Sequence, residues 1–405
     1  MSIFKQLGSQ DIVSTKTLLH EAIPLTGTIL SGAYGKNGSE RNIKNFSHGM
    51  FQSVYDYPYL SSSANHILDI TIGYHSDSVM SGNANTHKQN AKKINIYNQM
   101  AQVLMGYDKD GNIQAFDEDG DLTGGRKIKS AYFLSFSRLL VKDEVKKGSF
   151  SMQLGVGSYF DGSSSYYASD VTTNPAFAVT IADTNAATNY RVNSPAGEYG
   201  VLYATETTAR GNKILGNDTA IIGSNATTNP VGLIYYQAGI AVLTSSIFLG
   251  ESSSFGKTGL LAHENYPDTQ VPPVHSDQTR LHLQNPGTSS AHTVHHAFIS
   301  GSISGSADGL RTRIQNLQFN NTIELNSTIH FCRLNHNEFN YSANPTYLTG
   351  SQLRVKQNND DNPVSYITSI GLYSADNQLL AVGKLSEPIR KDPTIELTFR
   401  ARLDY

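Results

Sequence analysis

The last twelve residues constrain the fold of this chain more tightly than any other segment. From residue 394 to residue 405, polar side chains alternate with an apolar set: Ile395, Leu397, Phe399, Ala401, Leu403 and Tyr405. A period of two places the apolar set on one face of a β-strand. Because free chain ends normally fray, a strand that continues to the last residue must be held by a neighbouring element. The carboxyl-terminal part is therefore expected to be β structure.

A hairpin is predicted just before this strand. Residues 364–373 and 378–385 have strand-like patterns and flank Ser374-Ala375-Asp376-Asn377, which has the length and composition of a hairpin turn. The composition agrees with strands and polar turns, because only 16% of the residues are charged while there are 34 Gly, 22 Tyr and 16 Phe. Long helices are richer in Ala, Leu, Glu and Lys.

Further extended segments are expected at 12–19, 67–74, 149–155, 177–181, 200–203, 221–222 and 233–248. Within 149–155, Phe150, Met152 and Leu154 share one face. The apolar segment 128–141 fits a helix or a strand, since periodicity alone cannot distinguish them. The aromatic cluster 55–59 contains Pro58 and is expected to be a packed loop.

Helices are predicted at two places. Over 86–105, apolar residues recur at spacings of three and four, and Gly106 follows as a stop; the set is Ala91, Ile94, Tyr97, Ala101 and Leu104. Residues 304–317 fit a shorter helix with Leu310, Ile314 and Leu317 on one side.

The predicted fold class is mainly β with a few helices, with β-sandwich-like domains and an α+β amino-terminal part. A chain of 405 residues exceeds the usual size of one domain. We predict an α+β domain at 1–155, a strand-rich domain with long polar loops at 156–300, and a β domain at 301–405.

Two Asp-rich turns invite a calcium hypothesis. Asp108, Asp110 and Asn112, and likewise Asp117, Asp119 and Asp121, offer oxygen ligands at alternate positions. The loop of an EF-hand has Gly at its sixth position, where these turns have Ile113 and Leu122. Solvated turns are the favoured interpretation, and no metal site is assigned.

A second metal hypothesis concerns six histidines within one 34-residue stretch: His263, His275, His282, His292, His295 and His296. Imidazole is a common ligand of transition metals. No Cys lies nearby and no His-Glu-x-x-His sequence is present. Ordinary histidines are favoured, and metal binding stays open.

The motifs of common enzymes are missing from the sequence. The Gly-rich pieces 154–157 and 301–309 lack the Gly-Lys-Ser/Thr ending of a phosphate-binding loop and are expected to be turns. No Gly-x-Ser-x-Gly elbow occurs. The single Cys332 lies in an apolar run and is expected to be a small buried residue. We therefore predict no enzyme, no catalytic residue and no cofactor.

The net charge of −3 and the pI near 6.5 provide no global field for gathering nucleic acid or an acidic membrane. The sequence shows no 18-residue apolar stretch and no basic segment followed by an apolar run at its start. Neither nucleic acid, nor a membrane, nor secretion is therefore expected, and the lone cysteine fits a reducing compartment.

Three stretches resemble virion structural proteins of tailed bacteriophages, particularly large contractile-tailed ones. They are residues 136–150, residues 233–243, and residues 339–373 with their continuation to 405. The resemblance includes no catalytic motif. It implies a tail or baseplate component assembled in the host bacterial cytoplasm and located in the virion.

Three functions remain open on this basis. The first is assembly with copies of itself and with other virion proteins, in which terminal segments add strands to neighbours. The second is a carbohydrate- or receptor-binding module that uses Tyr-, Asn- and Ser-rich loops on a host surface glycan, although the chain has no Trp for sugar stacking. The third is a capsid or neck accessory protein. A cell-wall hydrolase would require an acidic pair that the sequence does not nominate.

Overall fold

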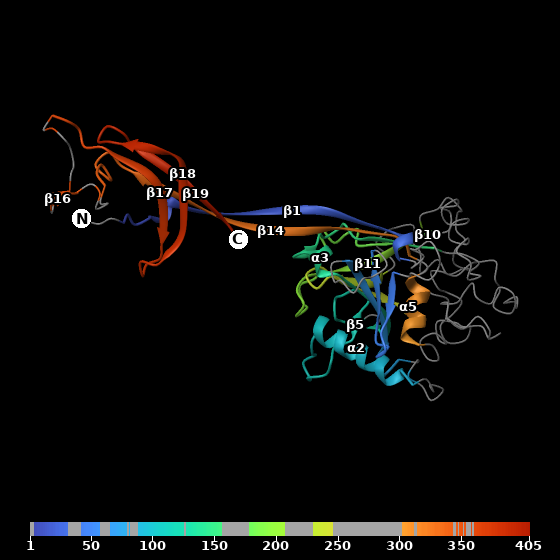
Figure 1. Ribbon diagram of the computed structural model, residues 1–405. Coiled ribbons are helices and arrows are strands. Elements are labelled where there is room, and N and C mark those ends of the chain that lie inside the picture. Colours follow the sequence, from blue (N-terminus) through green and yellow to red (C-terminus); the bar gives the residue numbers. More distant parts are fainter. Residues whose placement is uncertain are drawn as a thin grey trace, which may run out of the picture. The chain divides into compact units, whose positions relative to one another are not determined.

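A computed structural model (Figure 1) describes most of the chain. The described residues are 4–30, 42–56, 65–78, 81, 88–124, 127–155, 178–206, 230–245, 302–311, 314–342, 346, 348–350, 352–353, 358 and 360–405. The chain divides into two compact units. The terminal unit combines Met1–Leu19 with Glu324–Tyr405, and the central unit is His20–Ile323.

The fold is mainly β, as the sequence predicts, and it contains a large antiparallel sheet. The division into units differs from the predicted boundaries after residues 155 and 300. Strand β9 (Ser151–Gly155) pairs with β10 (Ala178–Ala182) and also with β14 (Ile314–Leu334). Hydrogen bonds of one sheet therefore cross both predicted boundaries, because strand pairing joins residues that are distant in sequence.

The central unit is built on one sheet with the strand order β14-β9-β10-β11-β12-β13-β7-β4-β3-β2. Each neighbouring pair is antiparallel. The remaining bounds are β11 (Tyr199–Glu206), β12 (Pro230–Tyr235), β13 (Ile240–Thr244), β7 (Ser130–Phe136), β4 (His66–Tyr74), β3 (Gln52–Tyr55) and β2 (Ile43–Asn45). Short elements join these strands: α1 (Gly27–Leu30), β5 (Phe116–Asp117), β6 (Lys127–Ile128) and β8 (Glu144–Val145).

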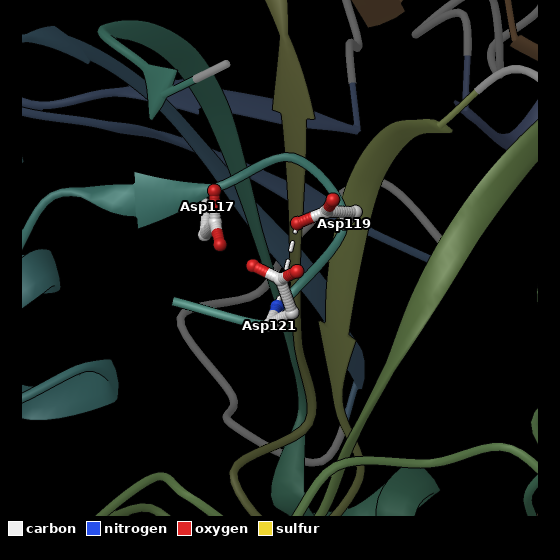
Figure 2. A group of neighbouring side chains, drawn as sticks. All are labelled: Asp117, Asp119 and Asp121. Carbon is white, nitrogen blue, oxygen red and sulfur yellow. Dashed lines mark hydrogen bonds between the residues drawn. The ribbon is translucent and has the colours of Figure 1, made fainter. Parts of the chain in front are cut away.

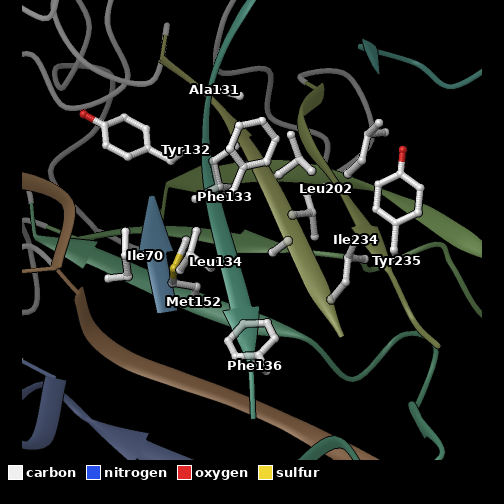
Figure 3. Close-up of a cluster of buried hydrophobic side chains, with 14 of the residues drawn as sticks. Ile70, Ala131, Tyr132, Phe133, Leu134, Phe136, Met152, Leu202, Ile234 and Tyr235 are labelled. Atoms are coloured by element: carbon white, nitrogen blue, oxygen red, sulfur yellow. The ribbon is translucent and has the colours of Figure 1, made fainter. Parts of the chain in front are cut away.

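The segment 128–141 forms strand β7 followed by one helical turn, α3 (Arg138–Val141). Strand β7 lies between β4 and β13, and its residues Tyr132, Phe133 and Leu134 are fully buried (Figure 3). A strand that is covered on both faces is apolar throughout, so it shows no alternation in sequence. This explains why the sequence pattern left helix and strand open.

The predicted helix at 86–105 is confirmed as α2 (Asn90–Leu104), which packs against β4. It ends at Gly106, which has a φ of 78° and donates its N–H to the Ala101 carbonyl at 3.0 Å. On β4, a Cβ at Gly73 would lie 2.7 Å from the Lys93 carbonyl oxygen. The absence of a side chain at Gly73 therefore allows α2 to approach the sheet closely.

Two sequence predictions in this unit need correction. Helix α5 spans Ile303–Arg311, so Ile314 and Leu317 belong to β14, and the Gly-rich segment near 305 is helical instead of a turn. The predicted segment 233–248 is divided, because residues 236–239 form a turn between β12 and β13. Gly239 has a φ of 65° there, which glycine adopts without steric cost. The segment 221–222 lies outside the described residues.

The terminal unit contains the predicted final strand and hairpin. Residues 327–334 of β14 pair with β19 (Leu397–Asp404), and the Tyr405 N–H donates to the Asn326 carbonyl at 2.9 Å. The hairpin consists of β17 (Ser365–Tyr373) and β18 (Leu379–Lys391), which is longer than the predicted 378–385. The Ser374 N–H closes its turn on the Gln378 carbonyl at 2.9 Å. A second pair is β15 (Leu348–Thr349) with β16 (Gln352–Leu353).

Strand β1 (Ile12–Thr26) confirms the predicted strand at 12–19 and extends beyond it, after a 3-10 turn, η1 (Ser9–Asp11). It neighbours β14 in the sheet. Both strands contribute residues to each unit, so two covalent connections join the units.

Candidate functional site

The two units differ in how they bury apolar side chains. The hydrophobic core cluster of the described residues consists entirely of central-unit residues, from Leu25 to Phe319 in the sequence. In the described part of the terminal unit, the only buried hydrophobic residue is Ile329, which is 9% exposed. The terminal unit therefore lacks a hydrophobic core made from its own described residues.

Among the residues that the structure describes, most of the exposed large hydrophobic ones belong to this same unit. They are Phe4, Ile12, Val13, Leu18, Leu19, Phe339, Tyr366, Tyr373, Leu379, Leu380, Val382, Ile389, Leu403 and Tyr405. Single exposed hydrophobic residues are ordinary, but a concentration of them marks an interaction surface. The candidate functional site is accordingly a surface for binding another chain.

The β17–β18 hairpin carries the most exposed part of this surface. Gly371 pairs with Val382, so both lie on one face of the hairpin. A Cβ at Gly371 would lie 2.8 Å from the Tyr373 ring and 3.2 Å from Leu379 Cδ1, so these two side chains occupy the same face. The register shifts between the pairs Leu372–Ala381 and Tyr373–Leu379, so Leu380 is the extra residue of a β-bulge next to Leu379. We call Tyr373, Leu379, Leu380 and Val382 the apolar row.

The apolar row is open to solvent. Its side chains are 45% (Tyr373), 54% (Leu379), 68% (Leu380) and 61% (Val382) exposed. The ring of Phe4, itself exposed, meets Tyr373 edge-on with centroids 4.8 Å apart. A two-stranded hairpin is only marginally stable in water without a covered face. The hairpin thus needs support from elsewhere.

Polar contacts supply part of that support at the open end of the hairpin. Lys391 is fully buried, and its Nζ donates to Asn340 Oδ1 at 2.7 Å, to the Asp392 carbonyl at 2.9 Å and to the His336 carbonyl at 3.2 Å. The Ser365 hydroxyl donates to the Phe339 carbonyl. Hydrogen bonds therefore anchor the strand ends in a place where apolar burial would ordinarily do so.

Hydrogen-bonded carboxylates make the terminal unit sensitive to acid. The Lys5 side chain lowers the pKa of Glu338, the Thr394 side chain lowers the pKa of Asp392, and the Ser327 hydroxyl lowers the pKa of Asp404. In each case the hydrogen bond favours the charged carboxylate over its protonated form. These contacts belong to the ionised state and weaken when the carboxylates are protonated.

The second candidate is the Asp-rich turn that follows β5 (Figure 2). Ligand atoms of Asp117, Asp119 and Asp121 lie within 4.8 Å of one another. The sixth position, Leu122, adopts a φ of 64°, which is uncommon for a residue other than Gly. A leucine at this position is unfavourable for a calcium loop by sequence, but the backbone adopts the left-handed region regardless.

Partners within the protein already occupy the buried carboxylate of this turn. Asp117 Oδ2 accepts the Leu122 N–H at 2.6 Å, and Asp117 Oδ1 lies 2.9 Å from Lys127 Nζ. That geometry is an ion pair although it is not aligned as a hydrogen bond. The pKa of Asp121 is lowered chiefly by the Thr123 N–H. The ammonium group of Lys127 thus neutralises charge where a cation would bind, and calcium binding remains a hypothesis.

The other sequence candidates can be placed as follows. Asp108 Oδ1 accepts the Asn112 N–H at 2.8 Å and the Asp110 N–H at 2.9 Å, as in a hairpin turn closed by its own side chain. Cys332 is half-buried instead of buried, and burial raises its thiol pKa. The six histidines at 263–296 lie outside the described residues, as do residues 57–59 of the aromatic cluster.

Comparisons with protein-family models, with curated proteins and with solved structures found no match to this chain. Within the described part, every helix is too short or too polar to cross a membrane.

Proposed function

We propose that this chain is a virion structural protein of a tailed bacteriophage, a tail or baseplate component that acts by assembling with copies of itself and with other virion proteins. The observation that carries the proposal is that the described residues of the terminal unit form no hydrophobic core of their own. The stretch 339–405, which resembles virion structural proteins, belongs to this same unit.

Folding free energies explain why an uncovered unit implies assembly. Ordering the backbone costs about 1–2 kcal/mol per residue, and burial of apolar surface is the main term that offsets this cost. In the central unit, side chains such as Phe133 and Tyr235 are fully buried. In the terminal unit the corresponding surface faces solvent. Subunits of obligate assemblies behave in this way, because neighbouring chains complete their cores.

A direct test is the protein content of purified phage particles from the virus that encodes the chain. Quantitative mass spectrometry of particles banded on a density gradient should find the chain in multiple copies per particle, as symmetric assembly requires. Particles that are complete and infectious but lack the chain would overturn the proposal.

A deletion tests the role of the terminal unit inside the particle. Removing residues 394–405 eliminates β19 and leaves the backbone of β14 from Ser327 to Leu334 without that strand partner. Incorporation of the chain into particles should then be lost. An appropriate control is a Val103→Asp variant, which changes an exposed residue of the central unit and should be incorporated normally.

A further inference from the structure

We infer that the apolar row of the β17–β18 hairpin docks against the same row of a second copy of this chain, in an antiparallel contact with two-fold symmetry. The inference rests on the proposed function and names the partner of its assembly surface. Three observations support it: which side chains share one face of the hairpin, where charged residues lie on either side of the apolar row, and how little apolar surface the terminal unit buries by itself.

Charged residues lie on both sides of the apolar row. Lys384 pairs with Ser369 and follows Val382 by two residues, so it continues the face of the apolar row on the side away from the turn. Asp376 lies in the turn at the opposite end. Both charged residues are exposed. Each hairpin therefore carries an acidic residue in its turn, an uncharged apolar row, and a basic residue on the other side of that row.

This order of charges suits one relative orientation of two hairpins. If two copies pack antiparallel about an axis through the apolar row, the turn of one lies beside Lys384 of the other, and Asp376 faces Lys384 at both ends of the contact. A parallel arrangement would instead place Asp376 beside Asp376 and Lys384 beside Lys384, which is unfavourable. The two-fold axis of the antiparallel arrangement falls midway, within the apolar row. Each apolar row then covers the other.

The two charges are too far apart to pair within one hairpin. About six strand residues separate the turn from Lys384, which at roughly 3.3 Å per residue is about 20 Å. Charges at this separation are strongly screened, since the Debye length is about 8 Å at physiological ionic strength. Any electrostatic coupling between these positions therefore has to act between chains.

The exposed apolar face of the hairpin also favours a second copy as the partner. The described part of the terminal unit leaves the hairpin with an exposed apolar face. An uncovered face of this kind is an aggregation hazard until a partner covers it. Another copy of the chain is present wherever the chain is synthesised, whereas a different protein is present only when it is expressed as well. We therefore assign the surface to a second copy.

The first test compares two valines that are equally exposed. Val382 in the apolar row is 61% exposed, and Val103 on α2 is 62% exposed. Sedimentation equilibrium of the purified full-length chain should show reversible association. Val382→Asp should raise the dissociation constant by about tenfold or more, because it places a carboxylate in an apolar contact. Val103→Asp should leave the constant unchanged. A full-length chain that stays monomeric at high concentration overturns the inference, as does equal association of all three proteins.

The second test reverses the end charges and does not depend on the apolar row. Asp376→Lys and Lys384→Asp should each weaken association, since each opposes like charges at both ends of the contact. The double variant Asp376→Lys/Lys384→Asp should associate again with nearly the original constant, more clearly at low salt than at high salt. Additive weakening in the double variant would show that the two positions do not meet, and the antiparallel arrangement would be wrong.

The outcomes separate this inference from the proposed function. A chain that is present in particles but associates independently of Val382 refutes the docking of the hairpins and leaves the virion role intact. A chain that associates through Val382 but is missing from particles refutes the virion role and leaves the docking intact.

Discussion

Lys391 offers the sharpest test of how the terminal unit is held together. We consider the substitution Lys391→Met, which keeps a long apolar stem and removes the ammonium group. Its Nζ is the donor to Asn340 Oδ1 and to the carbonyls of Asp392 and His336, at 2.7, 2.9 and 3.2 Å. Loss of the donor leaves these acceptors without this partner in a buried position.

The size of the effect follows from the number of hydrogen bonds lost. Each buried acceptor that loses its partner costs about 1–3 kcal/mol, and some of the three will recruit water. A total of about 2–4 kcal/mol is expected. At 1.4 kcal/mol per factor of ten, the open population of the hairpin should rise about thirtyfold to a thousandfold. Because the described part of the unit has so little apolar burial, nothing comparable compensates for this loss.

Hydrogen exchange measured by mass spectrometry resolves the effect by segment. Amides of β17 and β18 should exchange faster in the Lys391→Met variant, while those of β4 and β7 in the central unit keep their protection. Lys109→Met, at an exposed lysine in the turn before β5, is the matched control and should change neither segment. Unchanged exchange of β17 and β18 in the Lys391→Met variant would refute the view that polar contacts anchor the hairpin.

Three other predictions follow from the described contacts. Acidification from pH 6 to pH 3 should destabilise the terminal unit, as measured by hydrogen exchange. The pKa values of Glu338, Asp392 and Asp404 are lowered in the folded state, so the stability that these groups provide is present above the unfolded pKa of about 4 and is lost as the pH falls through the folded values. Protection that is independent of pH would contradict this. Gly73→Ala should lower the stability of the central unit by about 1–3 kcal/mol in urea unfolding, since its Cβ would collide with the Lys93 carbonyl oxygen. Millimolar calcium should produce no heat in isothermal titration, because Lys127 already neutralises Asp117, and a saturable heat signal would refute this account of the turn.

The candidate site was predicted in part. Both strands of the β17–β18 hairpin and its turn are evident from the sequence, because turn chemistry and alternation are local. The exposure of Leu380 and Val382 is not evident, since an apolar residue in a strand pattern is ordinarily taken to face a core. The Asp-rich turn was likewise predicted only in part. The sequence brings Asp117, Asp119 and Asp121 together, but the ion pair with Lys127 depends on the pairing of β5 with β6.

Strand β14 shows how tertiary structure can override local preference. It spans 21 residues and includes Asn316, Asn320, Asn321 and Asn326, a residue type depleted in strands. Sequence periodicity placed a helix across its start. The segment is a strand because β9, β8 and β19 pair with successive parts of it, and β1 is also its neighbour in the sheet. Backbone hydrogen bonds to those partners outweigh the weak preference of its side chains.

By itself, the sequence determined the mainly β character, the helix before Gly106 and the paired final strand, because each depends on periodicity or turn residues within about twenty positions. The places where the units divide, and the apolar faces that are covered, follow from the tertiary structure. Burial is a property of neighbours in space, and in a sheet those neighbours come from distant parts of the chain. Alternation along β17 and β18 looks the same whether a core, solvent or a second chain lies against it.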